Sequence, residues 1–198
     1  MWQRIKSLPD WRYVAIIIPI TALLQAIGPE HLRYERDWVQ TGQIWRIVTG
    51  HWVHVGWVHW FLNSFSLVVM VILTTPAWSV PRWIINTVGL AIGISILMTL
   101  FNPEVKDMAG HSGVLYGLFI LGALSLYAED RLIAILVIFA ILLKVCMEQF
   151  DFYDFNTSAF IGARVIVDSH MYGVFSAIAI ALGWSTYTMN HGTTEQSN

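Results

Sequence analysis

Six apolar stretches, separated by shorter polar segments, constrain this chain more than any other feature of its sequence. Each is close in length to the roughly 17–25 residues that an α-helix needs to cross a bilayer. Six such helices cannot hide their apolar side chains inside one globule of 198 residues. We therefore expect an all-α membrane protein that forms a single domain over residues 1–198. The expected transmembrane spans are 11–27, 52–75, 83–101, 113–128, 132–147 and 168–189, followed by a loose tail over 190–198.

The composition and the charge agree with a membrane protein. Hydrophobic residues make up 56% of the chain and charged residues only 12%, against roughly 45–50% and about 25% in soluble domains. A net charge of -2 without a basic run argues against binding of nucleic acid, because phosphate groups are bound by clustered Lys and Arg. Arg4, Lys6 and Arg12 precede or begin the first span, which favours cytoplasmic termini.

Strongly polar residues gather near the starts of three spans that are far apart in the sequence. With six spans, the second, fourth and sixth all run inward from the outer face, so residues near their starts share one depth. Polar groups inside a membrane usually face the bundle interior or a water-filled cavity, and each is a functional candidate. These residues are His54, His59 and Asn63 in the second span, Ser112 before the fourth, and His170 in the sixth.

Ser112 has the surroundings of a nucleophile. It stands in the run Gly110-His111-Ser112-Gly113 at the head of an apolar helix. Gly113 removes bulk beside the hydroxyl, the first-turn amides have no partner within the helix, and the helix dipole favours negative charge there. The alternative is a packing contact, since Gly and Ser are common where membrane helices touch.

His170 is the candidate base, because a neutral imidazole can take the serine proton and return it to a leaving amine. Gly173 follows one turn later and would let the sixth helix approach the fourth closely. Asp168 is two residues away and does not share the face of His170, so no triad is assigned. Tyr116, one turn after Ser112, would stack on His170 or serve ordinary packing. A purely structural role for His170 is the alternative.

His59 and Asn63 are four residues apart and face the same way from the second helix. Their side-chain N–H groups would join the Ser112 amide in binding an oxyanion. The alternative is a hydrogen-bonded pair between helices.

His51, His54 and His59 are spaced by three and five residues without an acid or thiolate nearby, so no metal site and no cofactor are expected.

Together these residues resemble the motifs of the rhomboid family of intramembrane serine proteases. The resemblance implies a six-helix rhomboid-like bundle with a Ser112–His170 dyad. It also implies an oxyanion hole formed by the Ser112 amide, His59 and Asn63, and membrane-anchored protein substrates that enter sideways from the lipid. His54, Gly110, Gly113, Tyr116 and Gly173 would support this site. The matching segments are Trp45-Arg46, HVGWVHWFLN over 54–63, GHSGVLYG over 110–117 and DSHMYG over 168–173.

A narrower resemblance is to the rhombosortases, a compact bacterial branch of that family. It rests on GHSGVLYGL, on VDSHMYG, and on Lys144 with Glu148 and Gln149. It implies removal of a Gly-Gly-type C-terminal sorting tail, with transfer of the new end to a glycerophosphoethanolamine-containing acceptor. It also implies the bacterial inner membrane, with the active site toward the periplasm. Lys144, Glu148 and Gln149 would then bind substrate or acceptor, or Lys144 and Glu148 would simply pair across one helical turn.

Two other classes of function compete with a protease. A non-catalytic rhomboid-like protein would bind and sort membrane helices, but it would need neither Ser112 and His170 nor His59 and Asn63. A small transporter or channel would place charges along a path, and the spans offer few besides Lys144. The four residues occurring together favour the protease.

Overall fold

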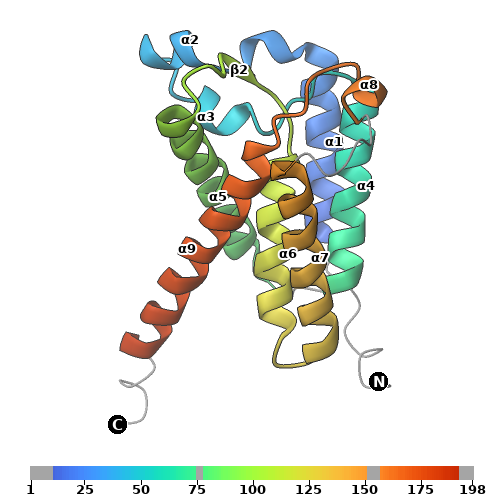
Figure 1. Ribbon diagram of the computed structural model, residues 1–198, viewed down its shortest axis with the longest axis vertical. Helices are drawn as coiled ribbons and strands as arrows, with labels where there is room; N and C mark the ends of the chain where they lie inside the picture. The colour runs from blue at the N-terminus through green and yellow to red at the C-terminus, as the bar shows by residue number, and fades with distance from the viewer. Residues whose placement is uncertain (1–10, 75–77, 151–156, 192–198) are drawn as a thin grey trace.

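The computed structural model describes residues 11–74, 78–150 and 157–191, and these residues form a predominantly helical bundle (Figure 1). Each expected span coincides with one long helix. The start of α1 and the end of α9 lie at the same end of the bundle, which is the end opposite to the short connecting elements. The long helices are α1 (Arg12–Ile27), α4 (Trp57–Thr74), α5 (Val80–Phe101), α6 (Ser112–Leu126), α7 (Arg131–Gln149) and α9 (Asp168–His191).

Judged by length and apolar composition alone, three helices within the described ranges could cross a membrane, namely α4, α5 and α7. α1 and α6 are apolar but shorter. The mostly helical fold is therefore confirmed, and the count of six membrane spans stays a prediction. α9 continues through His191, so two residues of the expected tail are helical and residues 192–198 lie outside the described part.

The helix on the second expected span begins at Trp57 rather than near Trp52. The intervening residues form a loop that turns into the core, where Val53 and His54 are almost completely buried. The main-chain N–H of His54 donates to Gln25 Oε1 of α1 at 2.9 Å. This side-chain partner takes the place of a helical one, and apolar content alone does not distinguish such a buried loop from a helix.

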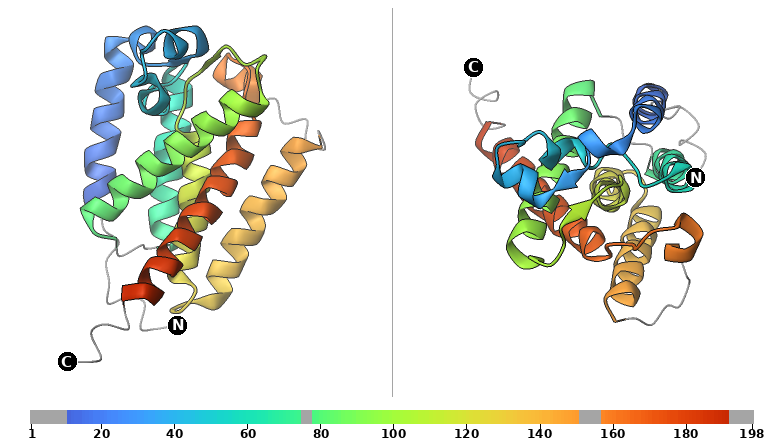
Figure 2. Two further views of the ribbon diagram at one scale, coloured as in Figure 1. Left: turned by 90° about the vertical axis from the view of Figure 1, so that its left-hand side faces the viewer. Right: turned by 90° about the horizontal axis from the view of Figure 1, so that it is seen from above.

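α6 is the central helix of the bundle. Seen from above it stands inside a ring formed by its neighbours (Figure 2), and it packs on α4, α5, α7 and α9. Of its 15 residues, 11 are buried. A helix that is apolar on all sides satisfies its whole surface only in such a position. The residue that begins α6, Ser112, is thereby held inside the protein.

The long connection between α1 and α4 is ordered by two buried arginines. The Arg36 guanidinium donates to the carbonyls of Met98, Thr99, Asn102 and Val105 at 2.8–3.2 Å. These carbonyls lie at and just beyond the end of α5, where backbone acceptors lack helical partners. Arg46 donates to three acceptors in the same connection. The elements here are η2 (Pro29–His31), β1 (Tyr34–Glu35), α2 (Arg36–Gln40) and α3 (Arg46–Thr49), and β1 pairs antiparallel with β2 (Asp107–Met108).

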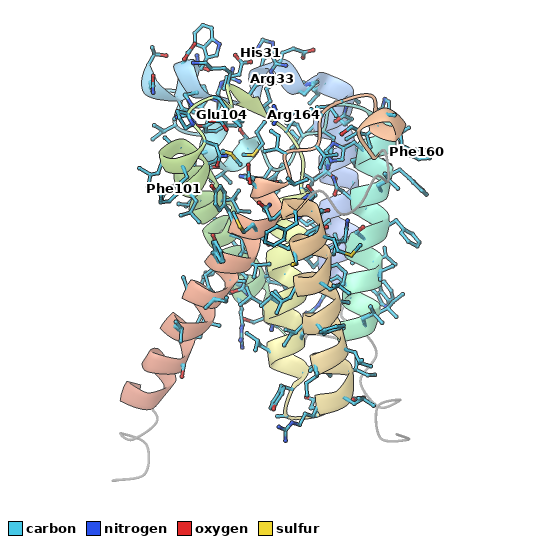
Figure 3. The ribbon with its side chains drawn as sticks, viewed as in Figure 1. His31, Arg33, Phe101, Glu104, Phe160 and Arg164 are labelled. Carbon is cyan, nitrogen blue, oxygen red and sulfur yellow. The ribbon has the colours of Figure 1, made fainter. Side chains whose placement is uncertain are left out.

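The connection between α7 and α9 contains one short helix, α8 (Thr157–Ile161), beside the upper part of α4 in Figure 1. Phe160 of α8 points away from the bundle and is 70% exposed (Figure 3). Arg164, which follows α8, lies nearer the middle of the molecule. Residues 151–156 of this connection lie outside the described part.

α6 and α9 cross at a pair of glycines. A Cβ atom placed on Gly173 would collide with the carbonyl oxygen of Gly113, and one placed on Gly113 would lie 2.7 Å from the Ser169 carbonyl oxygen. The two backbones are therefore in direct contact near the first turns of both helices. This close approach brings the residue that begins α6 to the first turn of α9.

Candidate active site

Ser112 and His170 face each other across the glycine crossing. Ser112 Oγ lies 3.0 Å from His170 Nε2, which is hydrogen-bonding distance. Ser112 begins α6, and His170 lies in the first turn of α9 with only 5% of its surface exposed. A serine hydroxyl that donates to a neutral imidazole nitrogen is the pairing needed to generate an alkoxide nucleophile.

The segment before Ser112 is pinned to the loop before α4. Gly110 N–H donates to the Gly50 carbonyl at 3.1 Å, and His111 Nδ1–H donates to the His51 carbonyl at 2.9 Å. Gly110 has a φ of +138°, and a Cβ atom there would lie 2.5 Å from His59 Cε1. Only glycine combines this backbone conformation with the close approach of the imidazole.

His51 and His111 form a neutral polar floor beneath this segment. Both are almost fully buried, and burial lowers the pKa of each imidazole below its ordinary value. The neighbouring His111 ring lowers the pKa of His51 further, because two adjacent imidazolium charges would repel each other. Ser95 Oγ donates its proton to the Ile47 carbonyl at 2.8 Å, so Ser95 Oγ in turn accepts from His51 Nε2–H at 3.0 Å. The hydrogen bonds thus define which nitrogen of each ring carries the proton.

His59 and Asn63 of α4 line the same cavity as Ser112. Asn63 is 7% exposed, and among the described residues its Nδ2 has no hydrogen-bond partner. Buried amide donors normally have a partner. A donor left free beside a nucleophile is suited to an oxygen that becomes negative during the reaction. His54 lies behind His59, ring edge to ring face at 5.2 Å, and does not itself line this cavity.

Two cavities meet at Ser112. The larger, of about 650 Å³, lies between α4 and α7 and is bounded above by α8 and the start of α9. The smaller, of about 350 Å³, lies between the 104–110 segment and the 161–169 segment. Ser112, His59, Ile161, Arg164 and Val165 line both. An extended chain laid across Ser112 would therefore have space on each side of the hydroxyl.

The face of His170 is covered by Tyr116. The two rings are stacked with centroids 4.2 Å apart and planes inclined by 2°. Tyr116 lies one turn after Ser112 on α6, so the helix that carries the hydroxyl also limits the tilt of the imidazole. Stacking and burial together hold the ring in one orientation.

The other ring nitrogen of His170 contacts Glu148, an acid for which the sequence left two roles open, substrate or acceptor binding and a pair with Lys144. His170 Nδ1 lies 2.8 Å from Glu148 Oε2. Glu148 also accepts from Lys144 Nζ at 2.7 Å and from the Tyr116 hydroxyl at 3.1 Å. An acid in an apolar helix is a functional signal in the sequence, but its partner follows only from how α7 packs beside α9. Gln149 lines the larger cavity next to Glu148.

Asp168, the acid nearest to His170 in the sequence, faces elsewhere. Its Oδ2 accepts from Asn102 Nδ2 at 2.9 Å, and Asn102 Oδ1 accepts from the Tyr172 hydroxyl at 2.6 Å. These bonds join the start of α9 to the end of α5. Within the described part of the chain, no three His, Cys, Asp or Glu side chains are grouped to hold a metal ion.

The fold and the site define a helical membrane protein with a Ser–His pair at the head of its central helix. The model of the Rhomboid domain family matches residues 41–187, which is well over half of the chain. The chain therefore belongs to the rhomboid family, and the family resemblance in its motifs is confirmed. Family membership and the apolar helices make it a multi-pass membrane protein.

One curated relative matches part of the chain. It is "Rhomboid-like protease 5" of Toxoplasma gondii, which is 34% identical over 83 residues. The match covers 42% of this chain and 10% of that protein. The likeness therefore concerns the rhomboid segment, and most of that relative has no counterpart in this alignment.

Proposed function

We propose that this protein is an intramembrane serine endopeptidase that cleaves transmembrane-anchored proteins. The observation that carries the proposal is the 3.0 Å contact between Ser112 Oγ and His170 Nε2 inside an otherwise apolar bundle. Family membership and the likeness to a rhomboid-like protease support the same class of activity. No cofactor takes part in this chemistry.

The reaction begins when Ser112 Oγ attacks the scissile carbonyl carbon and His170 Nε2 takes the hydroxyl proton. The peptide oxygen becomes an oxyanion in a tetrahedral intermediate. His170 then returns the proton to the leaving amine, the carbon–nitrogen bond breaks, and an acyl-enzyme ester on Ser112 remains. Water attacks this ester with His170 again as the base, which releases a new carboxylic acid and restores the serine.

The oxyanion is stabilised by the Ser112 main-chain N–H with the side chains of His59 and Asn63. The amides of the first turn of α6 have no acceptors within the helix, and the helix dipole favours negative charge at this end. The buried Asn63 amide, free of other partners in the described structure, supplies a donor that needs no rearrangement. Donors held in place before the reaction stabilise charge that develops in the transition state.

The depth of the site accounts for its choice of substrates. α6 has 15 residues and is about 22 Å long at 1.5 Å per residue, shorter than the ~30 Å hydrocarbon core. With both termini on the cytoplasmic side and six spans, Ser112 lies below the outer surface and faces the periplasm. A membrane-anchored segment entering between α4 and α7 would reach it through the larger cavity. The bacterial inner membrane is part of this proposal and rests on the resemblance to the rhombosortases.

The finer proposal is rhombosortase-type processing, in which the substrate is a Gly-Gly-type C-terminal sorting tail. Support comes from the segment 110–118 and from Lys144, Glu148 and Gln149 at the end of α7. Small residues before the scissile bond suit a hydroxyl recessed between two cavities. If an amine rather than water attacks the ester, the new C-terminus forms an amide with a glycerophosphoethanolamine-containing acceptor.

The test uses the purified full chain in liposomes with two membrane-anchored reporters, one of which carries a Gly-Gly-type tail. Ser112→Ala and His170→Ala are expected to abolish cleavage. Two variants serve as matched controls: Ser125→Ala at the other end of α6 and His31→Ala, which is exposed in η2. Both variants are expected to cleave the reporters at wild-type rates. Full activity in either of the first two variants would overturn the mechanism.

Mass spectrometry of the cleaved reporter decides the finer proposal. An added headgroup mass at the new C-terminus, lost in Ser112→Ala, would establish transfer, and a free carboxylate would establish hydrolysis under these conditions. Cleavage of the generic reporter alone would retain the protease and overturn the sorting-tail specificity. Binding of both reporters without cleavage of either would favour the non-catalytic protein that sorts membrane helices.

A further inference from the structure

We propose that Glu148 is a positioning residue for His170 and turns the expected dyad into a Ser112–His170–Glu148 triad. The inference rests on the proposed function, because it gives Glu148 a part in the same acyl transfer. Ser112 Oγ, His170 Nε2, His170 Nδ1 and Glu148 Oε2 follow one another with contacts of 3.0 Å and 2.8 Å at the two ends of the imidazole. The three residues come from the start of α6, the start of α9 and the last turn of α7.

The carboxylate selects the useful tautomer of His170. An ionised carboxylate only accepts hydrogen bonds, so His170 Nδ1 must carry a proton where it meets Glu148. Nε2 of the neutral ring then presents its lone pair to the Ser112 hydroxyl, as general-base catalysis requires. When His170 takes the serine proton, the imidazolium faces a negative charge at 2.8 Å. Glu148 stays ionised throughout and receives no proton.

Glu148 is itself held by two other residues. Oε2 faces His170, while Oε1 accepts from Lys144 Nζ at 2.7 Å and from the Tyr116 hydroxyl at 3.1 Å. The Glu148 side chain is 12% exposed, whereas the Lys144 side chain is 52% exposed. Lys144 supplies the positive charge that favours the ionised acid, and Tyr116 connects the acid to the helix that carries Ser112. A carboxylate with both oxygens occupied has one orientation.

The contacts of Tyr116 and Glu148 also hold the His170 ring in line with Ser112. Tyr116 stacks on the face of His170 and also donates to its acid, so one side chain limits both ring tilt and carboxylate rotation. Asp168 cannot serve instead, because its carboxylate is bonded to Asn102. The Lys144–Glu148 ion pair, one of the two roles that the sequence left open for these residues, is present, and it leaves the second carboxylate oxygen for His170.

Glu148→Gln is the informative variant because it keeps the shape of the side chain and removes its charge. Its amide can also donate toward Nδ1, which stabilises the wrong tautomer. Charged or titratable groups approach His170 from every helix packed around it and from the wall of the larger cavity. They are Glu148 and Lys144 on α7, Tyr116 on α6, His59 on α4, Asp168 on α9 and Arg164 on the cavity wall. Only the first of these charges changes in this variant.

The first readout is the rate at which a fluorophosphonate phosphonylates Ser112 Oγ, with loss of fluoride, in the purified full chain, measured from pH 5 to 9. This rate needs no knowledge of the natural substrate. Glu148→Gln is expected to lower it by about 10²–10⁴-fold, by analogy with loss of the acid in other triads. The pH profile of this rate is expected to differ from that of wild type, because the imidazolium that forms on His170 no longer faces a negative charge at Nδ1. Glu129→Gln, exposed beyond the far end of α6, is the matched control and should match wild type.

The second readout is the ¹⁵N NMR spectrum of His170, which reports the tautomer directly. Wild type is expected to show Nδ1–H, and Glu148→Gln a mixture or Nε2–H. A Glu148→Gln protein within threefold of wild type, or one that loses rate without change in pH profile or tautomer, would overturn the role of Glu148 and leave the Ser112–His170 pair standing. Labelling that persists unchanged in Ser112→Ala would instead overturn the proposed function itself.

Discussion

The glycine crossing of α6 and α9 predicts that one added methyl group on Gly173 separates the reacting side chains. In Gly173→Ala, Cβ would overlap the Gly113 carbonyl oxygen. Because a carbon and a nonbonded oxygen in contact lie roughly 3.3 Å or more apart, α9 must shift by more than about 1 Å at this point. His170 lies one turn earlier on the same helix, 3.0 Å from Ser112, and a shift of that size removes their hydrogen bond. We expect the rate of reporter cleavage to fall by about 10²-fold.

The stability of the same variant follows from two opposing terms. Alanine in place of glycine within a helix stabilises by about 0.5–1 kcal/mol, and overpacking of a tight contact costs about 1–3 kcal/mol. Gly173→Ala should therefore unfold more easily than wild type by up to about 2 kcal/mol in detergent. Gly183→Ala on the same helix is the matched control, since its Cβ would meet nothing within 4 Å. It should keep the wild-type rate and gain stability.

These measurements separate the crossing from a general effect of alanine. Cleavage by purified protein in liposomes gives the rate, and denaturant unfolding in micelles gives the stability. A Gly173→Ala protein that is as active and as stable as Gly183→Ala would refute the inference that backbone contact at Gly113 aligns the site.

Three further predictions concern the oxyanion site, the outer connection and pH. Asn63→Ala should lower kcat by about 10²–10³-fold. Its free energy of unfolding should change by less than ~1 kcal/mol, because the buried Nδ2 has no partner to lose in the described structure. An unchanged kcat would exclude Asn63 from the oxyanion hole. Arg36→Lys should lower the free energy of unfolding by about 2–4 kcal/mol, since one ammonium group cannot satisfy four carbonyls. Arg33→Lys, at an exposed ion pair, should lower it by under ~1 kcal/mol. Equal losses for the two variants in denaturant unfolding would contradict this. Burial lowers the pKa values of His51 and His111 in the folded protein, so the unfolded chain binds protons more readily. The free energy of unfolding should therefore be greatest above the ordinary histidine pKa near 6.5 and fall as the pH drops below it, by up to ~1.4 kcal/mol per pH unit for each ring. A constant free energy of unfolding between pH 7 and 5 would be the contrary result.

The larger share of the fold and half of the candidate site could be predicted from local sequence. Apolar length is a local property, and it placed a helix on each of the six expected spans. The sequence around Ser112 and His170 predicted a nucleophile at a helix start and a base one turn from a small residue. The structure brings these two side chains within 3.0 Å.

Two features could not be predicted, because they depend on partners distant in the sequence. The loop before α4 is held in the core by contacts with distant residues, among them the bond from His54 N–H to Gln25 Oε1 of α1 and that from Gly110 N–H to the Gly50 carbonyl. The ordering of the first connection likewise depends on carbonyls at the end of α5 that meet Arg36. Hydropathy sums over neighbours in the chain and contains no information about such contacts.

By itself the sequence determined that this is a helical membrane protein of the rhomboid family, because apolar length and short motifs are read along the chain. The proposed role of Glu148 rests on tertiary structure alone. Lys144 and Glu148 are one turn apart, and any helix would bring them together. The contact between Glu148 and His170 instead requires that α7 pack beside α9 with the last turn of one facing the first turn of the other. That arrangement follows from the packing of both helices around α6, where buried side chains from the whole bundle must fit at once.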